Sequence, residues 1–97
     1  MTKVEKIKEI LGENKSIIKK KYNVSYIGIF GSYVTGKEKK TSDVDILVEF
    51  KEPPTFFVFL ELEDFLSKLL GIKVDLVTRD ALKPHIGKKI LSEVVPL

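Results

Sequence analysis

Residues 31–50 read GSYVTGKEKKTSDVDILVEF, and this stretch decides the fold because it joins a glycine-serine turn to an apolar strand that carries acidic side chains. The run from Asp43 to Phe50 has the β-branched and aromatic composition of a strand. Asp43 and Asp45 occupy alternate positions, so they should project from one face with their Cα atoms about 7 Å apart. An ionised carboxylate between apolar neighbours is costly unless it is paired or holds a cation. The stretch therefore predicts a strand with a functional acidic pair.

Helical patterns flank this strand on both sides in the sequence. Apolar residues recur at helical spacing over residues 3–22 and predict one helix there, which Gly12 and Asn14 weaken in its middle. Thr55 is the expected N-cap of a second helix with a continuous apolar stripe, and Gly71 is its expected end. Such amphipathic patterns predict helices that cover a sheet with one face and meet solvent with the other.

Two further strands and a last helix complete the pattern. Strand composition is found over residues 25–30 and 73–78, and apolar residues over 82–94 predict a helix with Pro84 in its first turn. Helices and strands alternate with short connections and without an internal repeat. The pattern predicts an α/β fold, a single layered domain over residues 1–97 around a small sheet.

Composition excludes several classes of function. The chain has 97 residues, no cysteine and a net charge of +3. Disulfides and thiolate metal sites are therefore excluded, and a hard cation held by oxygen atoms is favoured. Lysine supplies most of the positive charge and Arg79 is the only arginine, so direct nucleic-acid binding is not expected. With no apolar run near the length of about 20 residues that a bilayer requires and no signal-peptide pattern, we expect a cytoplasmic protein without a membrane segment.

A third acidic residue interrupts another apolar strand. Asp75 lies within the run VDLV of residues 74–77. If this strand neighbours the first, Asp75 can face the acidic pair at the usual inter-strand spacing of about 4.8 Å. A cluster of carboxylates of this kind is typical of Mg²⁺ sites that act on phosphates. Glu49 lies about 13 Å along the strand from Asp45 and is not expected to join the cluster.

Ordinary alternatives to a metal site remain open at this stage. Asp75 could pair with Lys73 or Arg79 at the edge of the sheet. Asp43 and Asp45 could simply cap and solvate a turn before a strand. Only the combination of the turn, the spacing and a third acidic strand residue favours the metal site over these readings.

Gly31 and Ser32 form a turn that suits a phosphate group. Gly31 lets the backbone turn after a strand without a Cβ in the way, and Ser32 offers a hydroxyl. A short helix would follow, with N–H groups free to meet an anion, and Gly36 would end it. The lysines of residues 37–40 could add positive charge beside the phosphates, or they could belong to a solvated loop.

The pattern G-S-x₁₀-D-x-D over residues 31–45 resembles the motif of the DNA polymerase beta-like nucleotidyltransferase superfamily. Residues 73–78 and 82–91 are also similar to minimal nucleotidyltransferase (MNT) domain proteins, so the resemblance covers essentially residues 1–97. It implies an α+β-like fold, a single nucleotidyltransferase domain in which helices pack on a small mixed β-sheet.

The resemblance also implies roles for particular residues. Asp43, Asp45 and Asp75 would be the catalytic carboxylates that hold Mg²⁺, with two ions expected, and Gly31 and Ser32 would bind the nucleotide phosphates. ATP would be the substrate, and an acceptor hydroxyl would attack its α-phosphorus in line. Asp75 is the best candidate to take the proton of that hydroxyl, directly or through solvent.

A partner protein follows from the same resemblance. MNT proteins of this size resemble antitoxins that accompany HEPN ribonuclease toxins and transfer AMP from ATP to a toxin tyrosine. The leading interpretation is a Mg²⁺-dependent protein adenylyltransferase antitoxin whose partner is a HEPN-domain toxin on a separate chain. Two alternatives remain open: a non-catalytic antitoxin that masks the HEPN partner, and an adenylyltransferase that acts on a small molecule or an RNA end.

Three surface features carry weaker expectations. His85 has no evident partner and is expected on the surface of the last helix. The lysines of residues 15–21 are expected to form a solvated face rather than a binding patch. Phe56, Phe57 and Phe59 cannot all point inward from one helix, so at least one is expected on a partner surface.

Overall fold

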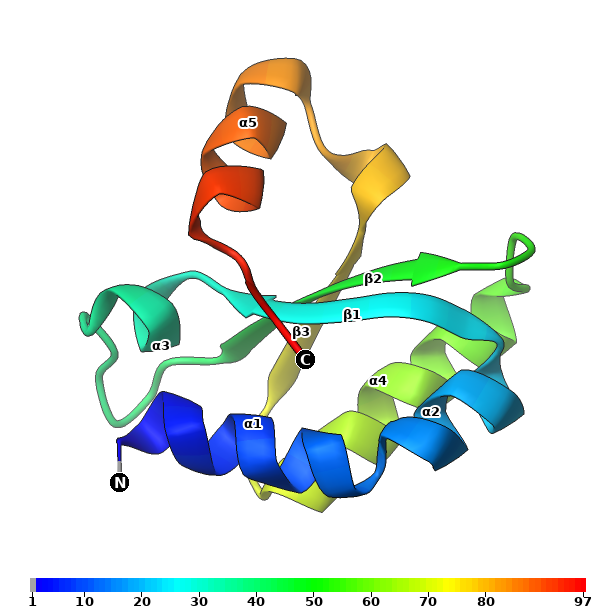
Figure 1. Cartoon of the computed structure of the whole chain (residues 1–97), viewed down its shortest axis with the longest axis horizontal. Coiled ribbons are helices and arrows are strands. Elements are labelled where there is room, and N and C mark those ends of the chain that lie inside the picture. Colours follow the sequence, from blue (N-terminus) through cyan, green and yellow to red (C-terminus); the bar gives the residue numbers. More distant parts are fainter. Residues whose placement is uncertain (1) are drawn as a thin grey trace.

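The elements of the fold follow the expected alternation of helices and strands (Figure 1). The computed structural model describes residues 2–97. In chain order the elements are α1 (Lys3–Glu13), α2 (Lys15–Tyr22), β1 (Val24–Phe30), α3 (Ser32–Thr35), β2 (Val44–Phe50), α4 (Phe56–Leu70), β3 (Val74–Thr78), a 3₁₀ turn (Arg79–Ala81), α5 (Pro84–Glu93) and β4 (Val95–Pro96).

The strands form one mixed sheet in the order β3-β2-β1-β4. β1 runs antiparallel to β2 and β4, whereas β2 and β3 are parallel. The expected mixed sheet is confirmed, and so is the expectation that the second and third strands are neighbours. β4 was not predicted, because a two-residue strand that contains Pro96 has no periodic pattern to reveal it.

The helices α1, α2 and α4 cover one face of the sheet, and α5 lies on the opposite side (Figure 1). The core between sheet and helices includes side chains with no exposed surface. These are Leu11, Ile18, Val24, Ile29, Val44, Ile46, Val48, Leu62 and Leu66. Burial of this apolar surface is the main favourable term in the folding of such a layered domain.

The single helix expected over residues 3–22 is wrong, because the chain forms two helices that meet at Asn14. The Asn14 side chain donates a hydrogen bond to the carbonyl of Ile10 at 2.9 Å, and its backbone N–H bonds the carbonyl of Leu11. Asparagine competes with helix hydrogen bonding in this local way, which ends α1 and starts α2. Apolar periodicity continues across the break and therefore does not show it.

The expected ends of α4 and the start of α5 are confirmed. The hydroxyl of Thr55 accepts a hydrogen bond from the N–H of Val58 at 3.2 Å, and Gly71 ends α4 in the left-handed conformation with φ +68°. Pro84 is the first residue of α5, where its missing N–H costs nothing. His85 follows it and is exposed, as expected.

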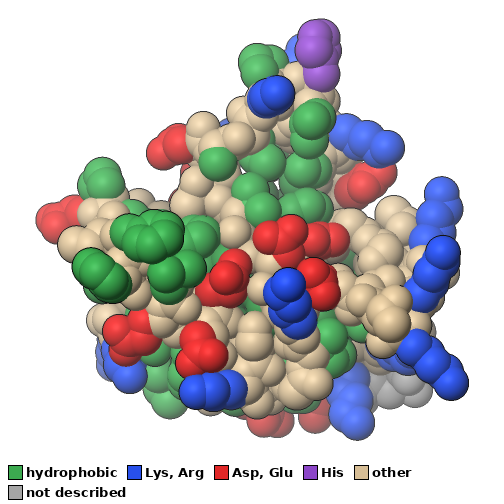
Figure 2. Space-filling model, turned by 180° about the vertical axis from the view of Figure 1, so that it is seen from behind, with side chains coloured by type: hydrophobic (Ala, Val, Ile, Leu, Met, Phe, Trp, Pro, Cys, Tyr) green, Lys and Arg blue, Asp and Glu red, His purple; other side chains and the backbone are tan. Residues whose placement is uncertain are grey.

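Exposed apolar side chains gather at the start of α4 (Figure 2). Phe56 and Phe57 are 70% and 81% exposed, whereas Phe59 packs against the core. The expectation that at least one of these three rings lies on the surface is confirmed. Across residues 2–97, no helix is both long enough and apolar enough to cross a membrane.

α5 projects from the body of the molecule in both overall views (Figures 1 and 2). β4 attaches the C-terminal end of α5 to the sheet, because it pairs with Gly28 and Ile29 of β1. A side chain at Gly28 would lie 2.6 Å from Cγ2 of Val94, so the absence of a Cβ there admits the segment that joins α5 to the sheet. Ile86 of α5 remains 55% exposed.

Candidate functional site

The turn after β1 packs directly against an acidic side chain of β2. Gly31 has φ +79° and ψ −152°, a conformation that only glycine adopts easily. A Cβ on Gly31 would collide with Oδ2 of Asp45 and lie 3.0 Å from its Cγ. The Asp45 carboxylate thus occupies the space that a side chain at Gly31 would need. α3 begins at Ser32, and Gly36 ends it with φ +76°, as expected.

Sheet register brings a second carboxylate beside the first. Asp45 is paired with Phe30 of β1 on one side and with Asp75 of β3 on the other. Neighbouring strands lie about 4.8 Å apart, and paired residues project from the same face. Asp45 and Asp75 therefore stand next to each other on the face opposite α1, α2 and α4, because the residues on either side of each in the chain belong to the core: Val44 and Ile46, and Val74 and Leu76.

Asp43 lies immediately before β2, not inside it as expected, because the strand begins at Val44. The segment before the strand is nevertheless fixed. The Tyr33 hydroxyl donates to the carbonyl of Ser42 at 3.3 Å, and the N–H of Lys39 donates to the Ser42 hydroxyl at 2.8 Å. These bonds hold the approach to β2, so Asp43 remains close enough to influence Asp45.

The Asp45 carboxylate lies near other negative charges that no ion pair among residues 2–97 balances. Burial, together with the negative charges of Asp75 and Asp43, raises the pKa of Asp45 to about 6. Within the described residues, no hydrogen bond or ion pair reaches any of these three carboxylates. The alternative in which Asp75 pairs with Arg79 is not supported, since Arg79 bonds Glu49.

The three carboxylates suit a hard cation by their chemistry, although they do not form a closed cluster as they stand. Among residues 2–97, no group of three acidic or histidine side chains is placed to hold a metal ion. Asp45 supplies the evidence for fit: its carboxylate is half-buried, lies against Gly31 and is destabilised by two acidic neighbours. Oxygen donors with unbalanced negative charge are what Mg²⁺ prefers.

The raised pKa of Asp45 predicts a pH-dependent stability in the metal-free protein. The folded-state value of about 6 exceeds the ordinary value of 3.8, so between these values the folded protein binds more protons than the unfolded chain. The free energy of unfolding should therefore fall as pH rises from about 4 to about 6, and the loss should persist above this range. Urea unfolding in a chelator at about pH 4 and pH 7 measures the effect.

Asp45→Asn is the control that isolates this residue from other titrating groups. The variant should gain stability relative to the wild type as pH rises from about 4 to 7, because asparagine has no charge that burial would penalise or that Asp75 and Asp43 would repel. A stability difference between the two proteins that does not change with pH would contradict the assigned cause.

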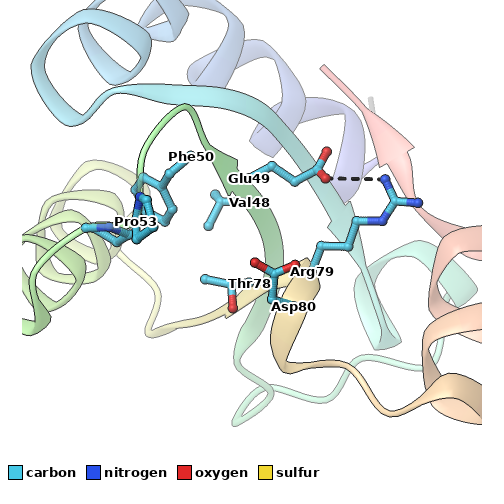
Figure 3. A pocket seen from close by; sticks show the side chains of 8 residues that line it. Val48, Glu49, Phe50, Pro53, Thr78, Arg79 and Asp80 are labelled. Atoms are coloured by element: carbon cyan, nitrogen blue, oxygen red, sulfur yellow. Dashed lines mark hydrogen bonds and ion pairs between the residues drawn. The ribbon is translucent and has the colours of Figure 1, made fainter.

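The opposite end of β2 forms a separate pocket of about 350 Å³ (Figure 3). Arg79 donates to the carboxylate of Glu49 across this pocket at 3.3 Å. Burial raises the pKa of Tyr26, the neighbour of Glu49 in β1, and Glu49 raises it further while Arg79 lowers it. Glu49 thus forms an ion pair with Arg79 at a distance from Asp43 and Asp45, in agreement with the expectation that it does not join the carboxylate cluster.

A basic hollow of about 470 Å³ adjoins Asp43. Its lysines come from three separate segments: Lys3, Lys39, Lys40 and Lys73. Figure 2 shows basic side chains along this edge of the molecule, on the side of α3 and the start of α1. Of the lysines that were expected near phosphates, Lys37 does not line the hollow. Whether the others meet a phosphate stays a prediction.

Sequence reasoning missed the side chains that hold β3. Ser67 and Glu63 of α4 bond the backbone of this strand at 2.9 Å. In the sequence they are only polar positions between the apolar residues of an amphipathic helix, so no local signal distinguishes them. Their contact with a strand more than six residues away is visible only in the folded chain.

The structure thus sets a glycine-serine turn beside carboxylates on neighbouring strands of a small mixed sheet, the arrangement that the resemblance to nucleotidyltransferases implies. The sequence agrees with this class, since residues 4–97 match the model of the family described as nucleotidyltransferase domain. The chain belongs to this family.

Relatives and solved structures extend the similarity over nearly the whole chain. Protein adenylyltransferase MntA of Thermococcus cleftensis is 48% identical, and the match covers 98% of this chain and 96% of the relative. A solved minimal nucleotidyltransferase is 30% identical with a TM-score of 0.83, and the match covers 100% of this chain and 97% of the other. The small mixed-sheet fold of a minimal nucleotidyltransferase is thereby confirmed.

Structures of toxin–antitoxin complexes are also similar. A crystal structure of a toxin–antitoxin with AMP-PNP contains a chain that is 25% identical with a TM-score of 0.69, covering 95% of this chain and 69% of that one. A complex of the tri-AMPylated HEPN toxin of Shewanella oneidensis with its MNT antitoxin gives 26% identity and a TM-score of 0.61, covering 89% and 68%.

Proposed function

We propose that the protein is a Mg²⁺-dependent protein adenylyltransferase that acts as an antitoxin. The observation that carries the proposal is the register that sets Asp45 beside Asp75, with the Asp45 carboxylate against the glycine of the turn at Gly31. This arrangement gathers negative charge next to the turn at which the family motif expects nucleotide phosphates. The naming of a 48% identical relative as protein adenylyltransferase MntA supports the same reaction.

Each site residue receives a role in this proposal. Asp43, Asp45 and Asp75 would hold the metal ions, and Gly31 with Ser32 would bind the triphosphate of ATP. Bound Mg²⁺ would supply positive charge that neutralises the phosphates and the departing pyrophosphate. The backbone at the start of α3 would orient the triphosphate, since first-turn N–H groups of a helix lack intrahelical partners.

We assign to Asp75 the role of accepting the proton of the acceptor hydroxyl. Its side chain is exposed at the edge of the site, whereas Asp45 is half-buried against Gly31. An acceptor hydroxyl can therefore approach Asp75 from solvent, and the carboxylate can accept its proton directly or through one water. Attack would then occur at the α-phosphorus of ATP and release pyrophosphate.

The acceptor that we propose is a tyrosine of a HEPN-domain toxin on a separate chain. The similar complex of an AMPylated HEPN toxin with an MNT antitoxin supports this choice of partner. The similar toxin–antitoxin structure with AMP-PNP supports ATP as the nucleotide. Exposed Phe56 and Phe57 offer apolar surface that a protein partner could cover.

Labelled ATP tests the reaction. With Mg²⁺ and the HEPN-domain protein from a neighbouring reading frame, we expect label from the α-phosphate on a partner tyrosine and none from the γ-phosphate. The physical reason is twofold. Residues 31–37 have the spacing G-x-x-x-x-G-K, but Glu38 stands where a P-loop has the serine or threonine that holds Mg²⁺, and the chain has no kinase catalytic loop to direct attack at the γ-phosphorus. Autoradiography and mass spectrometry of the partner measure the outcome.

The controls separate the competing functions. Replacement of the modified partner tyrosine by phenylalanine should remove the label while the two proteins still bind. Label from the γ-phosphate would instead identify a kinase. A tight complex that silences the partner without any transfer would favour the masking antitoxin and overturn the proposed reaction.

A further inference from the structure

The outer edge of β3 is closed by side chains of α4. β3 is the last strand of the sheet, so on its outer side the backbone N–H groups have no strand to bond. The Ser67 hydroxyl accepts from the N–H of Val74 and the Glu63 carboxylate accepts from the N–H of Leu76, each at 2.9 Å. The same Ser67 hydroxyl donates to the Glu63 carbonyl at 2.9 Å. The three bonds form one connected set between α4 and β3.

Val74 and Leu76, the two residues of β3 that α4 holds, flank Asp75 in the chain. On its inner side Asp75 pairs with Asp45 in the parallel ladder. Its own side chain is exposed, and within residues 2–97 no hydrogen bond or ion pair holds its carboxylate. The position of the carboxylate is therefore set by the backbone, which is fixed by β2 on one side and by Ser67 and Glu63 on the other.

Glu63 and Ser67 hold β3 more firmly than is needed to satisfy the free N–H groups of an edge strand. The Glu63 carboxylate is part-buried and bonds the amide of the residue that directly follows Asp75. A hydrogen bond to a charged acceptor is about twice as strong as one between neutral groups. A hydroxyl that both accepts and donates then ties the residue before Asp75 to the same helix.

We propose that Glu63 and Ser67 are positioning residues for Asp75. Through the backbone of β3 they set the distance and direction of the Asp75 carboxylate relative to Asp45, without touching the substrate themselves. The proposal rests on the proposed function, because it takes Asp75 as a carboxylate of the metal site. Misplacement of a reacting group by about 1 Å is enough to cost on the order of 100-fold in rate.

Paired substitutions at Glu63 test the proposal. Glu63→Met keeps length and apolar contact but has no oxygen to accept the bond, whereas Glu63→Gln keeps an acceptor. Asp64→Asn is the control on the same helix, because Asp64 forms only an exposed ion pair with Lys68. Mn²⁺ affinity, followed by paramagnetic resonance, reports on the carboxylates without requiring transfer, and amide exchange at Leu76 in the metal-free protein reports on the tether.

In Glu63→Met we expect faster exchange at Leu76, a Mn²⁺ affinity about 10-fold weaker and a lower kcat for AMP transfer at unchanged KM for ATP. Glu63→Gln should restore Mn²⁺ affinity to within about 2-fold, and Asp64→Asn should match the wild type. A variant that only destabilises the fold would lower the melting temperature and, through a smaller folded fraction, the apparent kcat, but its folded molecules would bind Mn²⁺ with wild-type affinity.

The outcomes distinguish this proposal from the function on which it rests. Wild-type Mn²⁺ affinity in a folded Glu63→Met protein would overturn the positioning role alone. A wild-type protein that binds no Mn²⁺ would overturn the metal site, and the positioning role with it. Transfer that is absent in the wild type while Mn²⁺ affinity still depends on Glu63 would overturn the proposed reaction and retain the positioning role.

Discussion

Asp45→Asn is expected to abolish AMP transfer while the protein remains folded. Asp45 is the acidic residue that lies against the Gly31 turn and beside Asp75, so its charge is central to any ion held between them. Loss of metal-based charge stabilisation worth several kcal/mol corresponds to a rate decrease on the order of 1,000-fold or more. Transfer of α-phosphate label to the partner measures it, with circular dichroism as the check on folding.

Glu49→Gln is the matched control for this substitution. Glu49 lies on the same strand with the same parity as Asp45, but it bonds Arg79 at the other end of the sheet. The exposed Glu49–Arg79 pair contributes little to stability, about 0 to 1 kcal/mol, and transfer should be unchanged. Transfer by Asp45→Asn at more than about a tenth of the wild-type rate would be incompatible with the role that we give Asp45.

Gly31→Ala is the second substitution with a large expected effect. The new Cβ would meet the Asp45 carboxylate, and the backbone conformation at Gly31 is strained for any residue with a side chain. Because the Asp45 carboxylate must move away, we expect transfer to fall on the order of 100-fold or more. The strain itself should lower the free energy of unfolding by about 1 to 3 kcal/mol.

Gly36→Ala separates the collision from the strain. Gly36 also has a positive φ, +76°, but a Cβ there meets no atom within 4 Å. Its left-handed conformation, with ψ +17°, is open to alanine at a cost of about 1 to 2 kcal/mol, so Gly36→Ala should lose some stability, though less than Gly31→Ala, while keeping transfer close to the wild type. Equal losses of transfer in the two variants would show that backbone strain at the ends of α3, and not the Asp45 contact, decides activity.

The comparison of Asp45→Asn with Glu49→Gln and that of Gly31→Ala with Gly36→Ala each separate an effect on catalysis from an effect on stability. On the face that carries Asp45 and Asp75 the sheet is accompanied by α5, whereas the core cluster is buried on the other face, under α1, α2 and α4. Substitutions at the site should therefore change activity more than stability, whereas truncation of a core residue such as Leu62 or Leu66 would chiefly destabilise the protein.

The sequence determined the features that depend on neighbouring residues. The β-branched and aromatic composition of 43–50 predicted a strand, Thr55 and Gly71 marked the ends of α4, and the motif from Gly31 to Asp45 carried the resemblance to nucleotidyltransferases. Such signals survive without a structure, because helix caps, left-handed glycines and strand alternation arise within a few residues of the chain.

Only the tertiary structure decided which distant groups meet. The parallel pairing of β2 with β3 puts Asp75 beside Asp45, although 29 intervening residues separate them in the chain. The space next to Gly31 proved to hold the Asp45 carboxylate, where the sequence suggested only room for phosphate. The Glu63 carboxylate accepts a hydrogen bond from the backbone of β3, a contact that the sequence did not predict. Hydrophobic periodicity tells which face of an element is buried but not which element will cover it, since that choice is made when the apolar faces pack together.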